Sequence, residues 1–470
     1  MLHTDLEEKK VIPHLVAELR ENFEKRVTRS LIYRQKQLQA LDEFLAQHEN
    51  EIKSALFQDL GKPSQEALST EIAIVRREIR DTRKNLSTWI RPKKVSTLFA
   101  AQPAKSHIQP EPLGVVLIIS PWNYPFQLSL MPLIGAIAAG NCAILKPSEL
   151  APASSQLMAK RLPEFLDSAS FQVVEGAIPE TTQLLQEHFD HIFFTGSGSV
   201  GKIIMHAAAK HLTPITLELG GKSPCIVNVD ANINVAAERI VWGKFSNVGQ
   251  TCIAPDYLLV HEEIEEELTQ CMVKKLREFY GEDPALSPDY GRIINERHHK
   301  RLTDLIASGG EILVGGKSNA ESLYIAPTIL KNLPPDALIM KEDMEIFGPI
   351  LPIIKIKSMK EAVDFIKRRP KPLSLYLFSE DPDIHRYVEK NTSSGGMVIN
   401  HTLLSGCILT LPFGGIGASG MGAYRGKASF DTFSHYKSVL TKPTWKLDIP
   451  SLVINPPYSK NKERLLRMVL

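Results

Sequence analysis

Residues 191–211 read HIFFTGSGSVGKIIMHAAAKH, and this stretch decides the fold class. The apolar run His191–Phe194 is typical of a buried strand, a G-x-G-x-x-G pattern follows it, and Lys202–His211 then has the composition of a helix. In such a strand, glycine turn and helix start, backbone N–H groups and the helix dipole point at a bound phosphate. The stretch therefore predicts a nucleotide site in an α/β fold. The residues assigned to this site are Gly196, Ser197, Val200 and Gly201.

Apolar runs and helical patterns alternate on both sides of this turn. The predicted strands of the first series are Val115–Ile119, Ala143–Leu145, Phe171–Glu175, His191–Phe194 and Ile215–Leu217. Those of a second series, between Pro224 and Asn400, include Cys225–Val229, Tyr257–Val260, Ile350–Ile356 and Met397–Ile399. Such alternation is typical of parallel sheets covered by helices on both faces. We therefore predict an α/β protein with two doubly wound domains.

The flanking segments have other patterns. From Pro13 to Trp89, apolar residues recur at spacings of three and four, which predicts helices that cover a sheet. Residues 95–112 are rich in small residues, and we expect them to form an excursion such as a hairpin. A second match to the phosphate pattern, Gly415–Gly420, is not followed by a good helix, so we predict a loop there.

Residues 112–145 contain no charged side chain, although a membrane-spanning helix needs only about 20 apolar residues. Prolines and amide side chains interrupt this stretch, so we predict a strand, a loop, a buried helix and a second strand instead. The basic amphipathic tail Lys460–Arg467 is predicted to be solvated or docked on the protein. Peripheral contact with a membrane is not predicted.

The composition limits the class of protein. A chain of 470 residues with 43% hydrophobic content can bury a large core and divides into two or more domains. The net charge of +2 gives no indication of a nucleic-acid partner, and the acidic N-terminus does not resemble a secretory signal. The five cysteines include no C-x-x-C pair and no cluster at metal-ligand spacing, which predicts a reduced, cytoplasmic protein without a metal site.

One cysteine stands in unusual surroundings. Cys252 ends the polar segment NVGQTC at 247–252, and Glu218 begins the motif ELGGK upstream of it. A thiol with a nearby base is a candidate nucleophile, provided that its environment favours the thiolate. An arbitrary free cysteine is more often a small buried hydrophobe. That structural interpretation applies to the other four cysteines, Cys142, Cys225, Cys271 and Cys407.

A second cofactor motif is Lys146-Pro147-Ser148-Glu149, which directly follows a predicted strand. In the ordinary dinucleotide-binding motif, the acidic ribose ligand lies about twenty residues after the glycines, which would select Glu218. We prefer the 146–149 motif, because ligands of open α/β sheets bind at the carboxyl ends of strands. Lys146 can bind ribose hydroxyls or phosphate, and Glu149 can accept hydrogen bonds from the adenosine ribose. A carboxylate there repels the 2′-phosphate of NADP, which favours NAD. The alternative is a helix start, with proline at its first position and glutamate in its first turn.

Taken in order, the motifs resemble the aldehyde dehydrogenase superfamily along nearly the whole chain, and most closely its class 3, fatty-aldehyde-type branch. The matching motifs are PWNYP at 121–125, KPSE at 146–149, FTGS at 194–197, LELGGKSP at 217–224, GQTCIAPDY at 249–257, EIFGP at 345–349 and PFGG at 412–415. The short N-terminus and SFDTFSH at 429–435 suggest class 3. Class 3 members usually have Ser or Asn followed by Thr in the phosphate turn, whereas here Gly198 follows Ser197.

The resemblance implies a covalent mechanism. Cys252 attacks the aldehyde carbonyl, and the side-chain amide of Asn123 and the backbone N–H of Cys252 bind the oxyanion. The thiohemiacetal passes a hydride to NAD, with NADP as the other possible acceptor, and leaves a thioester. Glu218 then activates the water that hydrolyses the thioester. From the residues alone, an Asx turn before proline is the preferred role of Asn123.

Three further cofactor residues come from the resemblance: Trp122, Glu345 and Phe347. Glu345 is expected to hold the nicotinamide ribose, and Phe347 to support the ring. The alternatives for these two are a surface charge and a core aromatic. The predicted substrate is a medium-chain, long-chain or otherwise apolar aldehyde, with chain length set by packing around Tyr124, Trp242 and His401. The competing functions are a CoA-acylating dehydrogenase and a nucleotide-binding protein of the same fold without turnover.

The resemblance also implies the domain organisation. Residues 1–94 and 113–216 form the NAD-binding domain, and residues 217–402 form the catalytic domain. Residues 95–112 and 403–445 form a small bridging arm for oligomerisation, which predicts a homodimer. Residues 446–470 remain as a C-terminal tail without a long apolar anchor.

Overall fold

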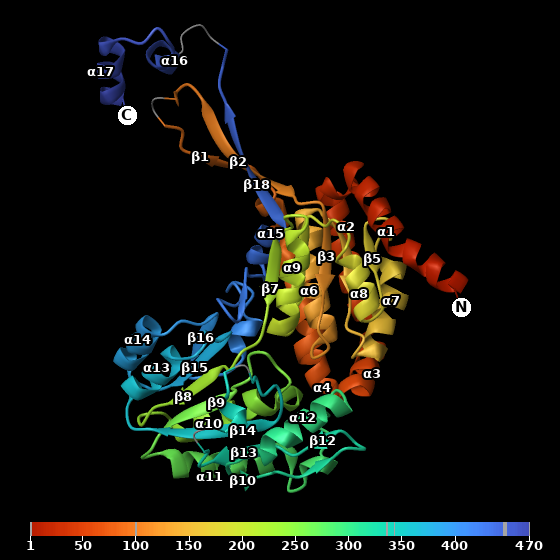
Figure 1. Ribbon diagram of the computed structural model, residues 1–470, viewed down its shortest axis with the longest axis vertical. Coiled ribbons are helices and arrows are strands. Elements are labelled where there is room, and N and C mark those ends of the chain that lie inside the picture. The colour runs from red at the N-terminus through yellow and green to blue at the C-terminus, as the bar shows by residue number, and fades with distance from the viewer. Residues whose placement is uncertain (1, 99–100, 335–336, 343, 445–448, 470) are drawn as a thin grey trace.

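The computed structural model has two α/β bodies and a thin arm that projects from one of them (Figure 1). It describes residues 2–98, 101–334, 337–342, 344–444 and 449–469. The two larger sheets have six and seven strands, the arm has three, and a separate pair, β11 (Ser318–Asn319) and β12 (Tyr324–Ile325), lies in the second body. The predicted fold class, α/β with parallel sheets, is confirmed.

The six-stranded sheet has the order β17-β7-β6-β3-β4-β5. Its strands are β3 (Val115–Ile119), β4 (Cys142–Lys146), β5 (Phe171–Val173), β6 (His191–Thr195), β7 (Ile215–Glu218) and β17 (Gly420–Met421). Neighbouring strands are parallel except that β17 runs antiparallel to β7. The five predicted strands of the first series are therefore confirmed, although β5 ends two residues before Glu175.

Helices cover both faces of this sheet. Strand β3 shows why, because Val116 and Ile118 belong to one core and Val115 and Leu117 to the other. The first core includes residues of α2 (Leu31–Gln47), α3 (Glu49–Leu60), α5 (Ile74–Trp89), α6 (Pro125–Ala139) and α7 (Pro152–Phe165). The second includes residues of α1 (Leu2–Glu24), α8 (Ile178–Leu184) and α9 (Gly198–Ala209). The uncharged stretch 112–145 is thus strand β3, helix α6 and strand β4, as predicted.

The seven-stranded sheet has the order β10-β13-β14-β9-β8-β15-β16. Its strands are β8 (Pro224–Val227), β9 (Tyr257–His261), β10 (Glu311–Val314), β13 (Thr328–Lys331), β14 (Ile350–Ile356), β15 (Ser374–Phe378) and β16 (Gly396–Ile399). Only β10 is antiparallel to its neighbour. The helices of this body are α10 (Ile233–Phe245), α11 (Glu265–Tyr280), α12 (Glu296–Ala307), α13 (Met359–Lys367) and α14 (Pro382–Asn391). Strands β10, β13 and β15 are not among the predicted ones.

The arm is a three-stranded antiparallel sheet of β1 (Lys93–Val95), β2 (Lys105–Pro112) and β18 (Ser434–Thr441). The expected hairpin is therefore present, and β18 adds a strand that the sequence did not predict. Two short helices, α16 (Ile449–Ile454) and α17 (Lys460–Val469), lie at the outer end of the arm (Figure 1). Among the described residues, no helix combines the length and apolar character needed to cross a bilayer.

Candidate active site

Four predicted site residues lie at one edge of the six-stranded sheet. Asn123 follows β3, Lys146 ends β4, Gly196 follows β6 and Glu218 ends β7. The strands are parallel, so their carboxyl ends meet at this edge, where ligands of open α/β sheets bind. The fold thus brings together residues that are up to 95 positions apart in the chain.

Cys252 approaches this edge from the second body. It is partly exposed and follows the short helix η4 (Ser246–Gly249). An apolar cluster surrounds it, made of Ile253, Leu373, Leu403 and Phe413. The preceding backbone is strained, because Asn247 and the β-branched Val248 have φ values of +51° and +56°. Such strain is typical of sites whose geometry the surrounding structure fixes.

The thiol of Cys252 has a high pKa in this arrangement. Burial, together with the carboxylates of Glu345 and Glu218, raises the pKa to about 12, and the Arg425 guanidinium acts in the opposite direction. The protein groups alone therefore do not supply the thiolate-favouring environment that a nucleophile requires. Arg425, which the sequence analysis did not single out, is the cation that favours the thiolate.

Glu218 is a buried carboxyl group at the end of β7, with 2% of its surface exposed. Neither carboxyl oxygen has a hydrogen-bond partner within the described part of the chain. Burial raises its pKa well above the ordinary value, and Arg425 partly offsets this effect. Glu218 and Cys252 interact, since the carboxylate charge contributes to the raised pKa of the thiol. Glu218 therefore lies close enough to the thiol for its charge to act on it.

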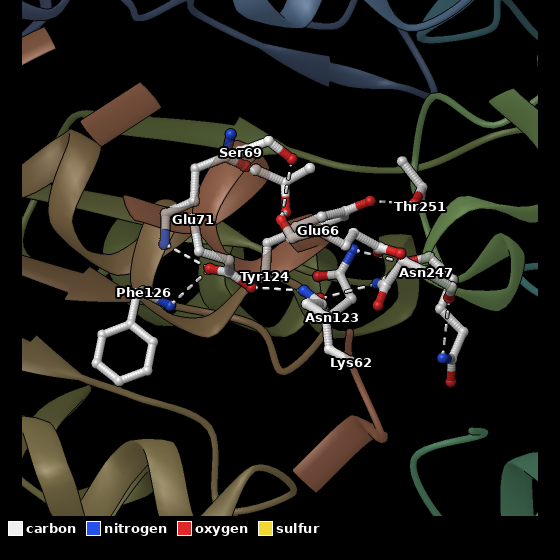
Figure 2. Close-up of polar contacts among 12 residues, drawn as sticks. Lys62, Glu66, Ser69, Glu71, Asn123, Tyr124, Phe126, Asn247 and Thr251 are labelled. Atoms are coloured by element: carbon white, nitrogen blue, oxygen red, sulfur yellow. Dashed lines mark hydrogen bonds and ion pairs between the residues drawn. The ribbon is translucent and has the colours of Figure 1, made fainter. Parts of the chain in front are cut away.

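Asn123 is buried beside the segment that carries Cys252. Its side-chain Nδ2 donates to the carbonyl oxygen of Gln250 at 2.9 Å, and its own carbonyl accepts from Lys62 and Asn247 (Figure 2). The Asx-turn alternative is wrong, because that turn requires an N–H two residues further on and residue 125 is proline. The amide is instead used across the interface between the two bodies.

The residues predicted to bind the nicotinamide end of the cofactor lie near one another. The ring centroids of Trp122 and Phe347 are 5.3 Å apart with the rings edge to face, and Trp122 also contacts His298. Phe347 has a φ of +46°, which is rare for a bulky residue. It is half-buried on Trp122, not in the centre of a core.

Glu345 packs against the glycine pair of the ELGGK motif. A Cβ atom at Gly220 would overlap its carboxylate, so the glycine is required for the close approach. Burial raises the pKa of Glu345 to about 8, Asp256 raises it too, and the Gly221 amide and Lys222 oppose the shift. A carboxyl held in this way is not the surface charge of the alternative interpretation.

The sequence analysis missed the residues that anchor this loop. Lys222 forms a buried ion pair with Asp256 and donates to the carbonyl oxygens of Ile339 and Met344 at 2.8 and 3.1 Å. Asp256 in turn accepts from the Ile346 amide at 2.8 Å. Both charged residues stand inside motifs quoted above, LELGGKSP and GQTCIAPDY. A charged residue inside each motif was the signal that the sequence offered.

Lys146 and Glu149 form an ion pair of 3.3 Å, with Lys146 buried and Glu149 exposed. Lys146 also donates to the carbonyl oxygen of Pro147 at 2.9 Å. The alternative of a helix start at Pro147 is wrong, because α7 begins at Pro152. These side chains therefore stand in a loop at the end of β4.

The glycine turn lies between strand and helix, as predicted. The Ser197 side chain caps α9 by accepting from the Val200 amide, and the Gly196 amide donates to the Glu218 carbonyl at 3.0 Å. A Cβ at Gly201 would lie 3.0 Å from Leu219, so a small residue is needed there. The exposed apolar side chain of Val200 suits the flat face of a nucleotide base. Lys146 and Glu149 lie at the end of β4, which is separated from β6 by β3 in the same sheet, and the residues present fit a dinucleotide.

Two other sequence predictions concern loops and metals. The second glycine match, at 415–420, is a loop that leads into strand β17, as predicted. Within the described residues, no three His, Cys, Asp or Glu side chains gather as a metal site would require. All five cysteines are free.

Comparisons with known proteins agree with this site. Residues 2–439 match the model of the aldehyde dehydrogenase family. The 4,4′-diaponeurosporen-aldehyde dehydrogenase of Staphylococcus aureus is 51% identical over 93% of this chain and 94% of its own length. The dimeric NADP-preferring aldehyde dehydrogenase of Rattus norvegicus is 48% identical over 92% of this chain and 94% of its own. A solved structure of Staphylococcus aureus AldH in a substrate-bound state is 48% identical, covers 98% of this chain and 99% of that one, and has a TM-score of 0.94.

The glycine turn, the buried carboxyl group and the cysteine together define a dinucleotide-dependent oxidoreductase with a thiol at its centre. The chain belongs to the aldehyde dehydrogenase family, and several of its relatives are family 3 members, which confirms the class 3 resemblance. It is an NAD(P)-dependent enzyme that oxidises aldehydes.

Proposed function

We propose that the enzyme oxidises apolar aldehydes to carboxylic acids through a thioester on Cys252, with Glu218 as the general base. The observation that carries this proposal is the pairing of a partly exposed thiol with a buried carboxyl group whose oxygens have no hydrogen-bond partner among the described residues. The charges of the two groups interact. A purely structural carboxyl group at 2% exposure would have its oxygens hydrogen-bonded.

In the first step, the Cys252 thiol gives its proton to solvent water, and the thiolate sulfur adds to the aldehyde carbon. The carbonyl oxygen gains negative charge in the resulting thiohemiacetal. The Asn123 amide and the backbone N–H of Cys252 donate to it, and one donor of this kind is worth about 2.7–4 kcal/mol. Bound NAD(P)⁺ supplies the acceptor for the hydride that leaves the same carbon, and a thioester remains on Cys252.

In the second step, the carboxylate of Glu218 takes a proton from water, and the oxygen of that water attacks the thioester carbon. The C–S bond breaks, so the acid is released and the thiol is restored. Burial supports this role, since a raised pKa makes the carboxylate a stronger base. The use of water distinguishes this enzyme from a CoA-acylating dehydrogenase.

For the cofactor, we assign the adenosine ribose to Lys146 and Glu149 and the nicotinamide end to Trp122, Glu345 and Phe347. The phosphates are assigned to the glycine turn of Gly196, Ser197, Val200 and Gly201. NAD is the favoured cofactor because the exposed Glu149 carboxylate repels a 2′-phosphate. The rat relative, by contrast, is called NADP-preferring.

The apolar substrate class has two supports. Cys252 packs against an apolar cluster of Ile253, Leu373, Leu403 and Phe413, which suits an apolar substrate. The Staphylococcus aureus relative is named for the aldehyde 4,4′-diaponeurosporen-aldehyde. Trp242 and His401, whose rings are 5.7 Å apart, are candidates for setting the chain length.

We also propose that the enzyme is a cytoplasmic homodimer. The name of the rat relative describes it as dimeric, which supports this assignment. The edge strands of the projecting arm, β1 and β18, each have a free side on which a second copy can pair. The six-stranded, seven-stranded and three-stranded sheets support the proposed division into an NAD-binding domain, a catalytic domain and an arm, although β17 of the six-stranded sheet lies within the residues assigned to the arm.

Absorbance of NADH tests the function directly. The enzyme is mixed with NAD⁺ and a series of aldehydes of increasing chain length, with and without CoA. The proposal expects NADH without CoA and a higher kcat/KM for longer, apolar aldehydes. A strict requirement for CoA would establish the acylating alternative, and no NADH with any aldehyde would establish a nucleotide-binding protein without turnover.

A further inference from the structure

Lys62 and Glu71 form an ion pair at the centre of the protein. The Nζ and Oε1 atoms are 2.6 Å apart, and neither side chain has any exposed surface. Moving two charges out of water costs several kcal/mol each, and their attraction often does no more than repay this cost. Stability alone therefore does not explain the pair, and its contacts indicate another role.

The pair binds the loop between β3 and α6 at Asn123 and also binds the first turn of α6. Lys62 Nζ donates to the carbonyl oxygen of Asn123 at 3.1 Å (Figure 2). Glu71 Oε2 accepts from the amides of Phe126 and Gln127 at 3.1 and 2.9 Å. These amides belong to the first turn of α6, where backbone N–H groups have no partner within the helix. The loop between β3 and α6 is thus held at Asn123 and at the helix start that follows it.

Local structure delivers Glu71 to this position. It lies in η2 (Leu68–Ala73), a π-helical segment between α4 (Ser64–Ala67) and α5. The Thr70 hydroxyl donates to the Glu66 carbonyl at 2.7 Å, and so stabilises the widened turn. Segments of π-helix are rare and frequently occur at functional sites. The turn directs Glu71 inward, although its neighbours Thr70 and Ala73 are not fully buried.

Asn123 is also bound from the other body. The Asn247 side-chain amide donates to the Asn123 carbonyl at 2.9 Å and to the Gln250 carbonyl at 3.1 Å. The Asn123 side chain donates one N–H to the same Gln250 oxygen. A primary amide has two N–H groups, so the second remains for a ligand.

We propose that Lys62 and Glu71 are positioning residues, which hold Asn123 so that its second amide N–H points at the oxyanion formed on Cys252. The proposal rests on the proposed function, in which Asn123 is an oxyanion donor. Neither Lys62 nor Glu71 touches the substrate. Their effect is geometric, and a misplacement of about 1 Å in such a donor costs about 10²-fold in rate.

Two reactions of Cys252 separate this role from a general effect on the thiol. Acylation by p-nitrophenyl acetate builds an oxyanion on the ester carbonyl, whereas alkylation by iodoacetamide builds none. Both need the thiolate, so the ratio of the two rate constants reports oxyanion stabilisation alone. The reactions are run without cofactor and followed by mass spectrometry of the peptide that contains Cys252.

The test variants are Lys62→Met and Glu71→Gln. Each is expected to lower the ratio of acylation to alkylation by about 10²-fold and to leave the alkylation rate near that of the parent. Glu71→Gln conserves the side-chain volume and keeps one acceptor oxygen for the Phe126 and Gln127 amides. It therefore tests the positioning role even if Lys62→Met does not fold. Asn123→Ala is expected to lower the ratio by about 10²–10³-fold, and adding Lys62→Met to it should give no further fall.

Arg34 provides a matched control at the other end of the same helix. It is a buried cation that donates to the carbonyl oxygens of Ala138 and Thr28, each at 3.0 Å. Arg34→Met should lower the stability of the protein and leave the ratio unchanged. An equal fall of the ratio in this variant would show a general packing effect and overturn the positioning role.

The outcomes also separate this inference from the function on which it rests. A parental ratio in both Lys62→Met and Glu71→Gln, with a low ratio in Asn123→Ala, overturns the positioning role and leaves the oxyanion role of Asn123 standing. A parental ratio in Asn123→Ala removes that oxyanion role itself. Additive losses in the double variant also contradict positioning through Asn123.

Discussion

Lys222 is paired with Asp256 inside the protein, and this pair joins three motifs that are far apart in the sequence. Lys222 belongs to LELGGKSP, Asp256 belongs to GQTCIAPDY, and both hold the backbone of EIFGP through Met344 and Ile346. The loop that carries Glu345 is thus held by the loop that follows Glu218 and by the segment that follows Cys252. The buried pair of Lys222 and Asp256 therefore fixes the three motifs relative to one another.

Removing one partner of the pair between Lys222 and Asp256 should lower the stability of the protein. Lys222→Met leaves Asp256 buried without its cation, which is expected to lower the free energy of unfolding by about 3–5 kcal/mol. Urea unfolding followed by circular dichroism measures the change. Lys300→Met removes an exposed pair with Asp304 and should change stability by less than about 1 kcal/mol. Equal, small effects of both variants would contradict the anchoring role.

Arg425 should control the ionisation of the thiol. Its charge lowers the pKa of Cys252 and of Glu218, although burial raises both more strongly. Both groups must be deprotonated to act, so kcat/KM should rise as the pH increases above neutrality. Arg425→Gln should move the pH profile of Cys252 alkylation to higher pH, and Arg425→Lys should move it less. A profile that is unchanged in Arg425→Gln would show that the guanidinium does not act on the thiol.

Gly220 should be required for cofactor binding. The Cβ of an alanine would overlap the Glu345 carboxylate and displace it from the proposed ribose site. Loss of a hydrogen bond to a charged group costs about 1.5–3 kcal/mol, so Gly220→Ala should weaken NAD⁺ binding by about 10–100-fold. Calorimetric titration with NAD⁺ measures this. Gly396→Ala, where an added Cβ meets open space, should bind NAD⁺ like the parent. Parental affinity in Gly220→Ala would remove Glu345 from the cofactor site.

Glu149 should set the choice of cofactor. Its carboxylate is exposed, so the repulsion of a 2′-phosphate is partly screened by solvent. Glu149→Gln should raise kcat/KM for NADP⁺ relative to NAD⁺ by up to about fivefold, which corresponds to about 1 kcal/mol. Initial rates with each cofactor, measured at low and high salt, test this. An unchanged ratio at both salt concentrations would place the specificity elsewhere.

Much of the fold followed from the periodicity of the sequence. The strand Val115–Ile119 and the turn after His191–Phe194 were predictable, since buried parallel strands are short apolar runs and phosphate turns need glycine. Strand β10 was harder, because it is antiparallel, lies at the sheet edge and is half exposed. Strand β18 is polar and pairs with β2, more than 300 residues earlier, and such pairing leaves no local signal.

The candidate site was predictable only where chemistry requires a particular residue type. Cys252 and Glu218 stood out from their neighbours, and they interact in the structure. Lys62 and Glu71 did not, because a helical region full of charges gives no sign of which ones are buried. The raised pKa of the Cys252 thiol also depends on burial and on Glu345, which is 93 residues away in the sequence.

The central claim is that Cys252 forms a thioester which Glu218 then hydrolyses. Glu218→Gln, mixed with NAD⁺ and an apolar aldehyde and sampled in the first turnover, tests it most directly. The account predicts a burst of NADH close to one per active site, then near arrest, with the acyl group found on the Cys252 peptide by mass spectrometry. Steady turnover at the parental rate, or an acyl group on any other residue, would contradict it.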